Sequence, residues 1–159
     1  MKQFLRFWCF ASGLVIVAGL LQGSSWFSFR GVKPNLLLVV ALSLIFFVDD
    51  FLTYVSLLVL SALMFQVRGG IDATTSIFLA MPAAAFFASR ILPWKALVNA
   101  LVTIVFGTVF FYALLDWDFV TQARWDIVLE TVYNMVAGIV FFFLIDRFSG
   151  YERQARTIF

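Results

Sequence analysis

The stretch Leu36-Leu-Leu-Val-Val-Ala-Leu-Ser-Leu-Ile-Phe-Phe-Val48 decides the fold, because it carries no charged side chain from end to end. Asp49 and Asp50 follow at once, and a second uncharged run begins at Phe51. The whole chain repeats this pattern: 64% of its 159 residues are hydrophobic and only 13% are charged. A soluble domain carries roughly 25% charged residues. Water is therefore not the main solvent of this chain.

Short segments that contain the charged residues, here called charged seams, separate the apolar runs. The runs have the length of membrane-spanning helices, which need about 20 mostly apolar residues. Transmembrane barrel strands would alternate apolar and polar residues, whereas these runs are continuous. We therefore expect an all-α integral membrane protein, a six-transmembrane-helix bundle in a single domain over 1–159. The predicted spans are 4–21, 35–48, 51–67, 74–92, 96–115 and 127–145. The second is short, and a re-entrant hairpin with the third is the alternative.

The basic residues predict the orientation of these spans, since Lys and Arg accumulate in cytoplasmic loops. With a cytoplasmic N-terminus, the inner seams carry seven basic residues and the outer seams four, which together account for all eleven. We therefore expect both termini in the cytoplasm and the first run retained as a helix, not cleaved as a signal peptide. The inner residues are Lys2, Arg6, Arg90, Lys95, Arg147, Arg153 and Arg156, and the outer ones are Arg30, Lys33, Arg68 and Arg124.

The inventory of reactive side chains is thin. The chain has no histidine and a single cysteine, Cys9, within the first apolar run. A structural zinc site of four Cys or His ligands and a Ser-His or Cys-His nucleophile are therefore both excluded. The net charge of +2 gives no indication of nucleic-acid binding. We expect no catalytic residue, no metal and no cofactor.

Asp49 and Asp50 form the sharpest carboxylate cluster. Adjacent acids can hold a diphosphate through Mg²⁺, as in an enzyme acting on lipid phosphates. The other carboxylates predicted on the inner side are only Asp146 and Glu152. We favour a structural role, in which the pair ends one helix and caps the next, because Asp is a preferred N-cap residue.

Polar residues within the sixth run share one helix face. Glu130, Asn134 and Gly138 recur every four residues. A carboxyl and an amide inside a membrane-spanning helix should face the bundle or a partner. We expect Asn134 to form an interhelical hydrogen bond. For Glu130 two possibilities stay open, a polar contact between helices or solvation at the level of the lipid head groups.

Small residues predict where helices pack closely, as small-xxx-small motifs do in membranes. One such stripe, in the fourth run, consists of Ser76, Ala80, Ala84 and Ala88. Pro82 lies within the same run and should kink it. Gly19 and Gly23 form a second motif at the end of the first run. Each motif is interpreted as a face for helix packing or for contact with a partner.

Two stretches resemble the MreD family of rod shape-determining proteins. The first, Gly31 to Leu42, has a basic residue, Pro34, Asn35 and then a Leu-rich helix. The second is the last helix, with Glu130, Asn134 and Ala137, then Phe141-Phe142-Phe143 and an exit through Asp146-Arg147-Phe148. The segment between Gln66 and Asp72 only approximates the family's G-x-x-x-D pattern.

The resemblance implies a non-enzymatic scaffold of the bacterial cell-elongation machinery, which maintains rod shape through peptidoglycan synthesis. It implies a location in the inner membrane and a fold similar to the substrate-binding subunits of energy-coupling-factor transporters. The implied partners are an MreC-like single-span membrane protein, a RodA-type glycosyltransferase, a class B penicillin-binding transpeptidase and the lipid bilayer, with no nucleic acid.

Two other functions remain open. The first is a substrate-binding membrane subunit for a vitamin or small solute. It would need a cavity with convergent polar groups, for which Glu130, Asn134, Arg68 and Asn99 are the candidates. The second is the lipid-phosphate enzyme at Asp49 and Asp50.

Overall fold

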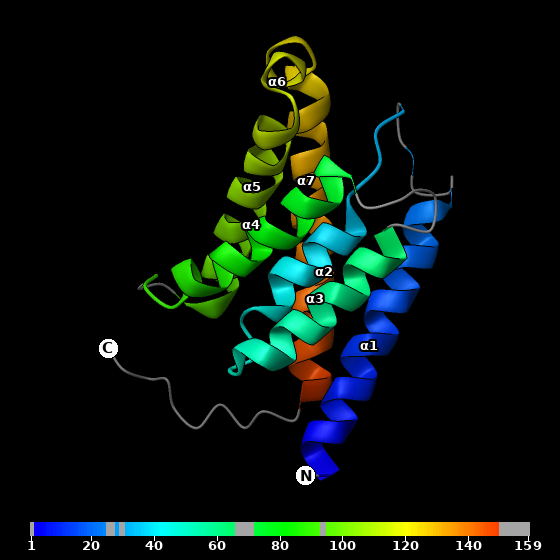
Figure 1. The fold of residues 1–159 in the computed structure, drawn as a ribbon, viewed down its shortest axis with the longest axis vertical. Coiled ribbons are helices and arrows are strands. Elements are labelled where there is room, and N and C mark those ends of the chain that lie inside the picture. Colours follow the sequence, from blue (N-terminus) through cyan, green and yellow to red (C-terminus); the bar gives the residue numbers. More distant parts are fainter. Residues whose placement is uncertain (1, 25–27, 29–30, 66–71, 93–94, 150–159) are drawn as a thin grey trace.

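The computed structural model describes residues 2–24, 28, 31–65, 72–92 and 95–149. This part of the chain contains seven helices and no strand (Figure 1). The helices are α1 (Lys2–Gly23), α2 (Leu36–Leu44), α3 (Phe51–Phe65), α4 (Ala73–Ser89), α5 (Ala96–Leu115), α6 (Trp117–Gln122) and α7 (Arg124–Ser149). Arg30, Arg68, the Gly69-Gly70 pair, Arg153 and Arg156 lie outside the described residues.

Three helices are long and apolar enough to cross a membrane. They are α1 over Leu5–Gly23, α5 over Ala96–Leu115 and α7 over Arg124–Ser149, with 19, 20 and 26 residues. Two further helices, α3 and α4, are apolar but shorter. The expectation of an all-α membrane protein is therefore confirmed.

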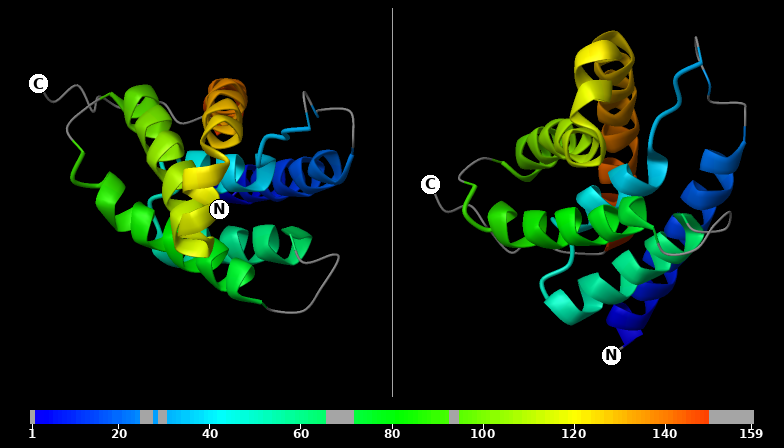
Figure 2. Two further views of the ribbon diagram at one scale, coloured as in Figure 1. Left: turned by 90° about the horizontal axis from the view of Figure 1, so that it is seen from above. Right: turned by 45° about the horizontal axis from the view of Figure 1, so that its top comes forward.

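Helix α2 occupies the centre of the molecule. All nine of its residues, Leu36–Leu44, are buried, and it packs against α1, α3, α4, α5 and α7 (Figures 1 and 2). Nine residues rise about 13 Å, less than half of the ~30 Å hydrocarbon core. This helix is hydrophobic on every side because protein surrounds it on every side.

The second predicted run, 35–48, is helical only in its first part. After Leu44 the chain tightens into turns, in which the Phe46 and Phe47 N–H groups donate to the Ser43 and Leu44 carbonyls at 3.3 and 3.0 Å. The prediction of a continuous span over 35–48 therefore overestimated the helix, because apolar residues can be buried in a turn as well as in a helix.

A short helix that the sequence analysis did not predict follows α5. Helix α6 begins after Asp116, whose carboxylate accepts hydrogen bonds from the Asp118 and Phe119 N–H groups at 2.9 and 3.1 Å. It leads directly into α7, which starts at Arg124, three residues before the predicted position. The acidic and aromatic seam between the last two runs is thus helical for much of its length.

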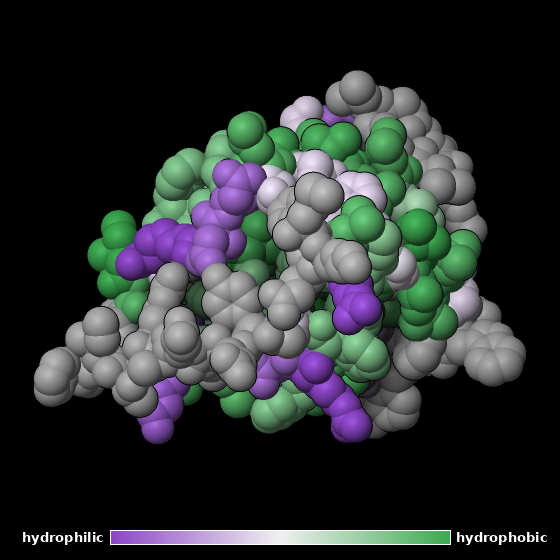
Figure 3. Space-filling model, turned by 90° about the horizontal axis from the view of Figure 1, so that it is seen from below, coloured by the Kyte–Doolittle hydropathy of each residue, from purple (hydrophilic) through white to green (hydrophobic). Residues whose placement is uncertain are grey.

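The two long outer helices α1 and α7 place the ends of the described chain on the same side. The start of α1 and the end of α7 lie at one end of the molecule (Figure 1), where the rings of Phe10 and Phe148 stack with centroids 4.7 Å apart. Viewed from that end, hydrophilic residues reach from the left side of the face to its lower edge, and apolar residues lie across its upper part (Figure 3).

Two contacts fix the other helices around α2. The Tyr54 hydroxyl of α3 donates to the Ala41 carbonyl of α2 at 3.1 Å and to the Pro82 carbonyl of α4 at 3.4 Å. At Gly138 of α7 the packing is so close that an added Cβ would overlap the Ile104 side chain of α5 and would lie 3.7 Å from Val39 Cγ1 of α2. Helix α4 continues through Pro82, and the kink that proline predicts stays a prediction.

The Gly138 contact predicts a selective loss of stability. Gly138→Val should destabilise the bundle by about 1–3 kcal/mol, because overpacking forces neighbouring side chains out of place. Gly13→Val is the matched control, since a Cβ at Gly13 meets nothing within 4 Å. Unfolding in mixed micelles with increasing dodecyl sulfate measures both. Equal stability of the two variants would contradict the close packing of Gly138 against Ile104.

Candidate functional site

The N-terminus of α2 is buried, and side chains from three places hold its backbone donors. The Asn35 N–H donates to Asn134 Oδ1 at 2.8 Å. The Leu37 N–H donates to Gln22 Oε1 at 2.9 Å, and the Leu38 N–H donates to the N-cap Asn35 Oδ1 at 3.2 Å. A buried helix end without such partners would leave costly unpaired donors. Side chains of α1 and α7 therefore accept the hydrogen bonds that the first backbone N–H groups of α2 cannot form within the helix.

Asn134 connects three helices. Its side chain is fully buried, and besides the bond from Asn35 its Nδ2 donates to Thr108 Oγ1 at 3.0 Å. The Thr108 hydroxyl donates in turn to the Ile104 carbonyl at 2.8 Å. These contacts confirm the interhelical hydrogen bond expected of Asn134, and they join α7 to α2 and α5.

Glu130 lies one turn earlier on the same face and is also buried, with 8% of its surface exposed. Its Oε2 accepts a hydrogen bond from the Tyr112 hydroxyl of α5 at 2.7 Å. Of the two possibilities left open for Glu130, the structure shows the polar contact between helices. Gly138 completes this face, so all three residues that the spacing grouped together point into the bundle.

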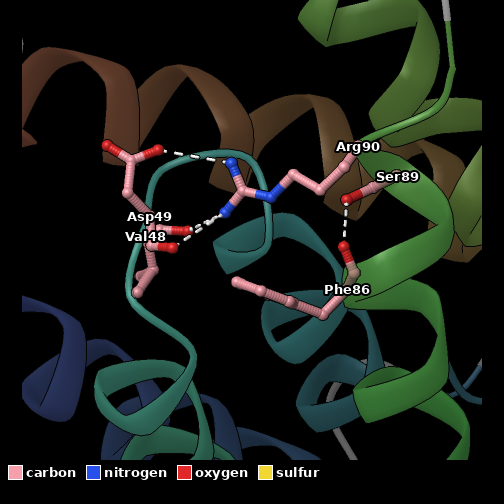
Figure 4. Close-up of polar contacts among 5 residues, drawn as sticks. All are labelled: Val48, Asp49, Phe86, Ser89 and Arg90. Atoms are coloured by element: carbon pink, nitrogen blue, oxygen red, sulfur yellow. Dashed lines mark hydrogen bonds and ion pairs between the residues drawn. The ribbon is translucent and has the colours of Figure 1, made fainter.

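The other end of α2 is held by Arg90, which follows α4. Its Nη2 donates to the Val48 carbonyl at 2.8 Å, and its Nη1 lies 3.3 Å from Asp49 Oδ1 (Figure 4). The guanidinium carbon also lies 4.6 Å from the centroid of the Phe86 ring. A half-exposed ion pair contributes little by itself. The bond to the carbonyl, with the cation over the aromatic ring, ties the turn after α2 to α4.

The neighbouring carboxylate, Asp50, caps α3. Its Oδ2 accepts a hydrogen bond from the Thr53 N–H at 2.7 Å. This bond and a second one from the Thr53 side chain hold the pKa of Asp50 below its ordinary value of 3.8. Asp49 and Asp50 therefore each have a structural contact, as the capping interpretation predicts.

The stripe of small residues on α4 is exposed along its whole length. Ser76, Ala80, Ala84 and Ala88 all face outwards, while Thr75, Phe78, Pro82 and Phe86 form the buried face of the helix. The stripe lines an open groove of about 820 Å³ between α4 and α5. The predicted packing face is thus not covered by another helix in the described part of this chain.

Large apolar side chains of α5 form the other wall of this α4–α5 groove. Phe106, Phe110 and Leu114 recur every four residues and are 68%, 58% and 52% exposed. The remaining groove residues are Ile77, Met81, Ala85, Ser89, Leu92, Val102, Thr103 and Gly107. No charged side chain belongs to this set. The groove is therefore a long apolar surface with one flat wall and one ridged wall.

A second cavity has a different character. It measures about 530 Å³, is half-open and is lined by Gly31, Val32, Lys33, Tyr112, Phe119, Asp126 and Glu130. It lies where α5, α6 and α7 meet the segment that precedes α2. Two carboxylates, one ammonium and two aromatic rings converge here.

The remaining candidates have simpler surroundings. A Cβ at Gly19 would lie 2.9 Å from Met64 Cβ of α3, whereas one at Gly23 would meet nothing within 4 Å. The first glycine is thus a packing position and the second is open. The Asn99 Nδ2 donates to the Leu92 carbonyl at 3.3 Å, and Asn99 is not among the residues that line the polar cavity.

Several residues of this architecture were missed by sequence reasoning. Thr108 and Tyr112 of α5 bond to Asn134 and Glu130, and Gln22 of α1 accepts the hydrogen bond from the Leu37 N–H. A polar residue within an apolar run was the available signal in each case, but their partners could not be assigned from one sequence.

Comparison with known proteins gives no relative: no family model, no curated protein and no solved structure matches this chain.

The contacts of Asn134 predict a marked effect of its removal. Asn134→Ala should destabilise the protein by about 1–3 kcal/mol, because it leaves the buried Asn35 N–H without an acceptor. Thr108→Val removes a single interhelical bond and should lose about 0.6 kcal/mol. Unfolding by dodecyl sulfate in mixed micelles compares the two. An Asn134→Ala variant no less stable than Thr108→Val would refute the role given to the Asn35 bond.

The cap of α3 predicts a dependence on pH. Because the folded pKa of Asp50 is lowered, its stabilising effect is complete above the ordinary value of about 3.8 and is lost as the pH falls through the folded pKa. Asp50→Ala should therefore differ from the wild type most at neutral pH and least in acid. Melting curves in detergent measure the difference, with Asp50→Asn as a control that keeps an acceptor. A difference that grows in acid would contradict the cap.

Proposed function

We propose that this protein is a non-enzymatic scaffold of the bacterial cell-elongation machinery, related to the MreD proteins, which holds the membrane helix of a single-span partner. One observation carries the proposal: the α4–α5 groove exposes a complete small-residue stripe to the surroundings. In a bilayer, such stripes drive association because they let two helices approach closely and gain van der Waals contact.

The dimensions of the groove suit one helix. From Ser76 to Ala88 the stripe extends 12 residues, or about 18 Å at 1.5 Å per residue, over half of the ~30 Å hydrocarbon core. Its flat wall on α4 would receive the partner's backbone, and the ridge of Phe106, Phe110 and Leu114 would pack beside it. Acyl chains can also cover apolar surface, but they gain nothing from a regular four-residue spacing of small side chains.

The family resemblance supports the same function. The two stretches that carry it, Gly31 to Leu42 and the helix from Glu130 to Phe148, meet in the hydrogen bond between Asn35 and Asn134. The two stretches that resemble the family are therefore in direct contact in this fold. The fold proposed is that of six apolar segments, similar to the substrate-binding subunits of energy-coupling-factor transporters, with the enclosed α2 as the second.

The proposed setting is the bacterial inner membrane, with both termini in the cytoplasm. The excess of basic residues on the inner seams supports this orientation, as does the shared end at which α1 begins and α7 ends. An MreC-like protein is the proposed owner of the helix in the groove. A RodA-type glycosyltransferase and its class B transpeptidase would join through that partner.

The alternative, a membrane subunit that binds a vitamin or other solute, is less well supported. Such a subunit needs a cavity enclosed by the helices. Here the buried side chains of α2 fill the centre of the bundle. The polar cavity near Glu130 is half-open and lies where α5, α6 and α7 meet, outside this centre.

Filling the groove tests the scaffold. Ala84→Trp should abolish co-purification of the single-span partner without loss of stability, because Ala84 is exposed and the larger ring blocks close approach. Val136→Trp is the matched control, since Val136 is 58% exposed on α7, away from the groove. Both are measured by affinity purification from cells in mild detergent. Retention of the partner by Ala84→Trp, or its equal loss in both variants, would overturn the proposal.

A further inference from the structure

The polar cavity at the junction of α5, α6 and α7 has features of a ligand site that the scaffold function does not require. Its walls come from four parts of the chain: the segment before α2, the end of α5, α6 and the start of α7. Its volume of about 530 Å³ is within the range of small-molecule sites. Its floor is the buried carboxyl group of Glu130.

Within the described part of the chain, one oxygen of that carboxyl group has no hydrogen-bond partner. Glu130 is 8% exposed, and its Oε2 is satisfied by the Tyr112 hydroxyl. Its Oε1 is buried and has no hydrogen-bond partner among the described residues. Buried polar atoms are nearly always paired, because an unpaired one loses the hydrogen bonds that water would give it. A donor on a bound molecule would satisfy Glu130 Oε1.

The surrounding groups favour a cationic donor. Asp126 lies four residues before Glu130, on the same face of α7, and lines the cavity from its exposed rim. The rings of Tyr112 and Phe119 stand side by side with centroids 5.7 Å apart. Two carboxyl groups and two aromatic rings together recognise an ammonium group through charge-assisted hydrogen bonds and cation–π contact.

The segment before α2 brings a positive charge to the same cavity. Lys33 lines the cavity and donates one hydrogen bond from Nζ to the Ser24 carbonyl at 3.0 Å. An ammonium group has three donors, so two remain for an anion. A molecule with both a primary ammonium and an anionic group would satisfy both charges at once.

We propose that this cavity binds the zwitterionic head group of an aminophospholipid, with its ammonium on Glu130 and Asp126 and its phosphate on Lys33. Trp117 and Trp125 flank this end of the molecule and are 65% and 73% exposed. Tryptophan is enriched at the level of the lipid head groups, so the cavity has the depth at which such a head group lies. This site is independent of the α4–α5 groove and extends the scaffold function.

The chemistry predicts selectivity. A primary ammonium can donate to Glu130 Oε1, whereas the trimethylammonium of a choline head group has no N–H to donate. A glycerol head group has no cation. The site should therefore prefer phosphatidylethanolamine to phosphatidylcholine and phosphatidylglycerol.

Native mass spectrometry of the full chain, released from nanodiscs of equal parts of these three lipids, tests the site. We expect phosphatidylethanolamine to be retained in preference, and Glu130→Gln to reduce its retention about tenfold, the loss of one charge-assisted hydrogen bond. Lys33→Gln should reduce it as well, and since Lys33 is exposed this variant serves if Glu130→Gln does not fold. Asp118→Asn is the control, an exposed carboxylate outside the cavity.

A second measurement separates the two sources of the head group. The two possible sources are a membrane lipid and a free small molecule. Titration of the detergent-purified protein with O-phosphoethanolamine tests the free molecule. Binding of this compound without retention of lipid would support the same recognition of ammonium and phosphate groups, with a soluble ligand in place of a lipid. Equal retention of the three lipids together with no binding of O-phosphoethanolamine would overturn the proposal. The proposal would also be overturned if Lys33→Gln and a folded Glu130→Gln both retained phosphatidylethanolamine at the wild-type level.

Discussion

The hydrogen bond from the Asn35 N–H to the Asn134 side chain fixes the position of α2 inside the bundle. A short helix without contact to water cannot leave its first donors unpaired, so α2 needs polar atoms from its neighbours. Asn134 supplies one and Gln22 another, while Arg90 binds the carbonyl of Val48 just beyond the other end. Once both ends are held, α2 can serve as the core on which the longer helices pack.

This core determines which surfaces remain for other molecules. Because α2 fills the centre, α4 turns Phe78 and Phe86 inwards and leaves its stripe of small residues outside. The groove beside α5 is the result. At the other end, the polar face of α7 continues past Asn134 to Glu130 and opens into the cavity near Lys33. The molecule thus has an apolar surface suited to a helix and a polar cavity suited to a head group, and the buried hydrogen bonds of Asn134 lie between them.

Much of the fold follows from the sequence, because charged seams are costly in lipid and therefore delimit the helices. The run 96–115 matches α5, and the faces of α4 and α7 follow from a four-residue spacing. The sequence could not show that α2 ends at Leu44, since burial in a turn looks like burial in a helix. Nor could it pair Asn134 with Asn35, 99 residues away. The unpredicted α6 had one local signal, the capping Asp116.

The proposed scaffold depends on contact between the small-residue face of α4 and a partner's membrane helix. Photo-crosslinking in living cells, with a photoreactive residue at position 84 in the groove or at position 136 on α7, tests this contact directly. We expect one crosslinked protein, a small single-span membrane protein, at position 84 and none at position 136. Crosslinks to lipid alone at position 84, or the same protein from both positions, would contradict it.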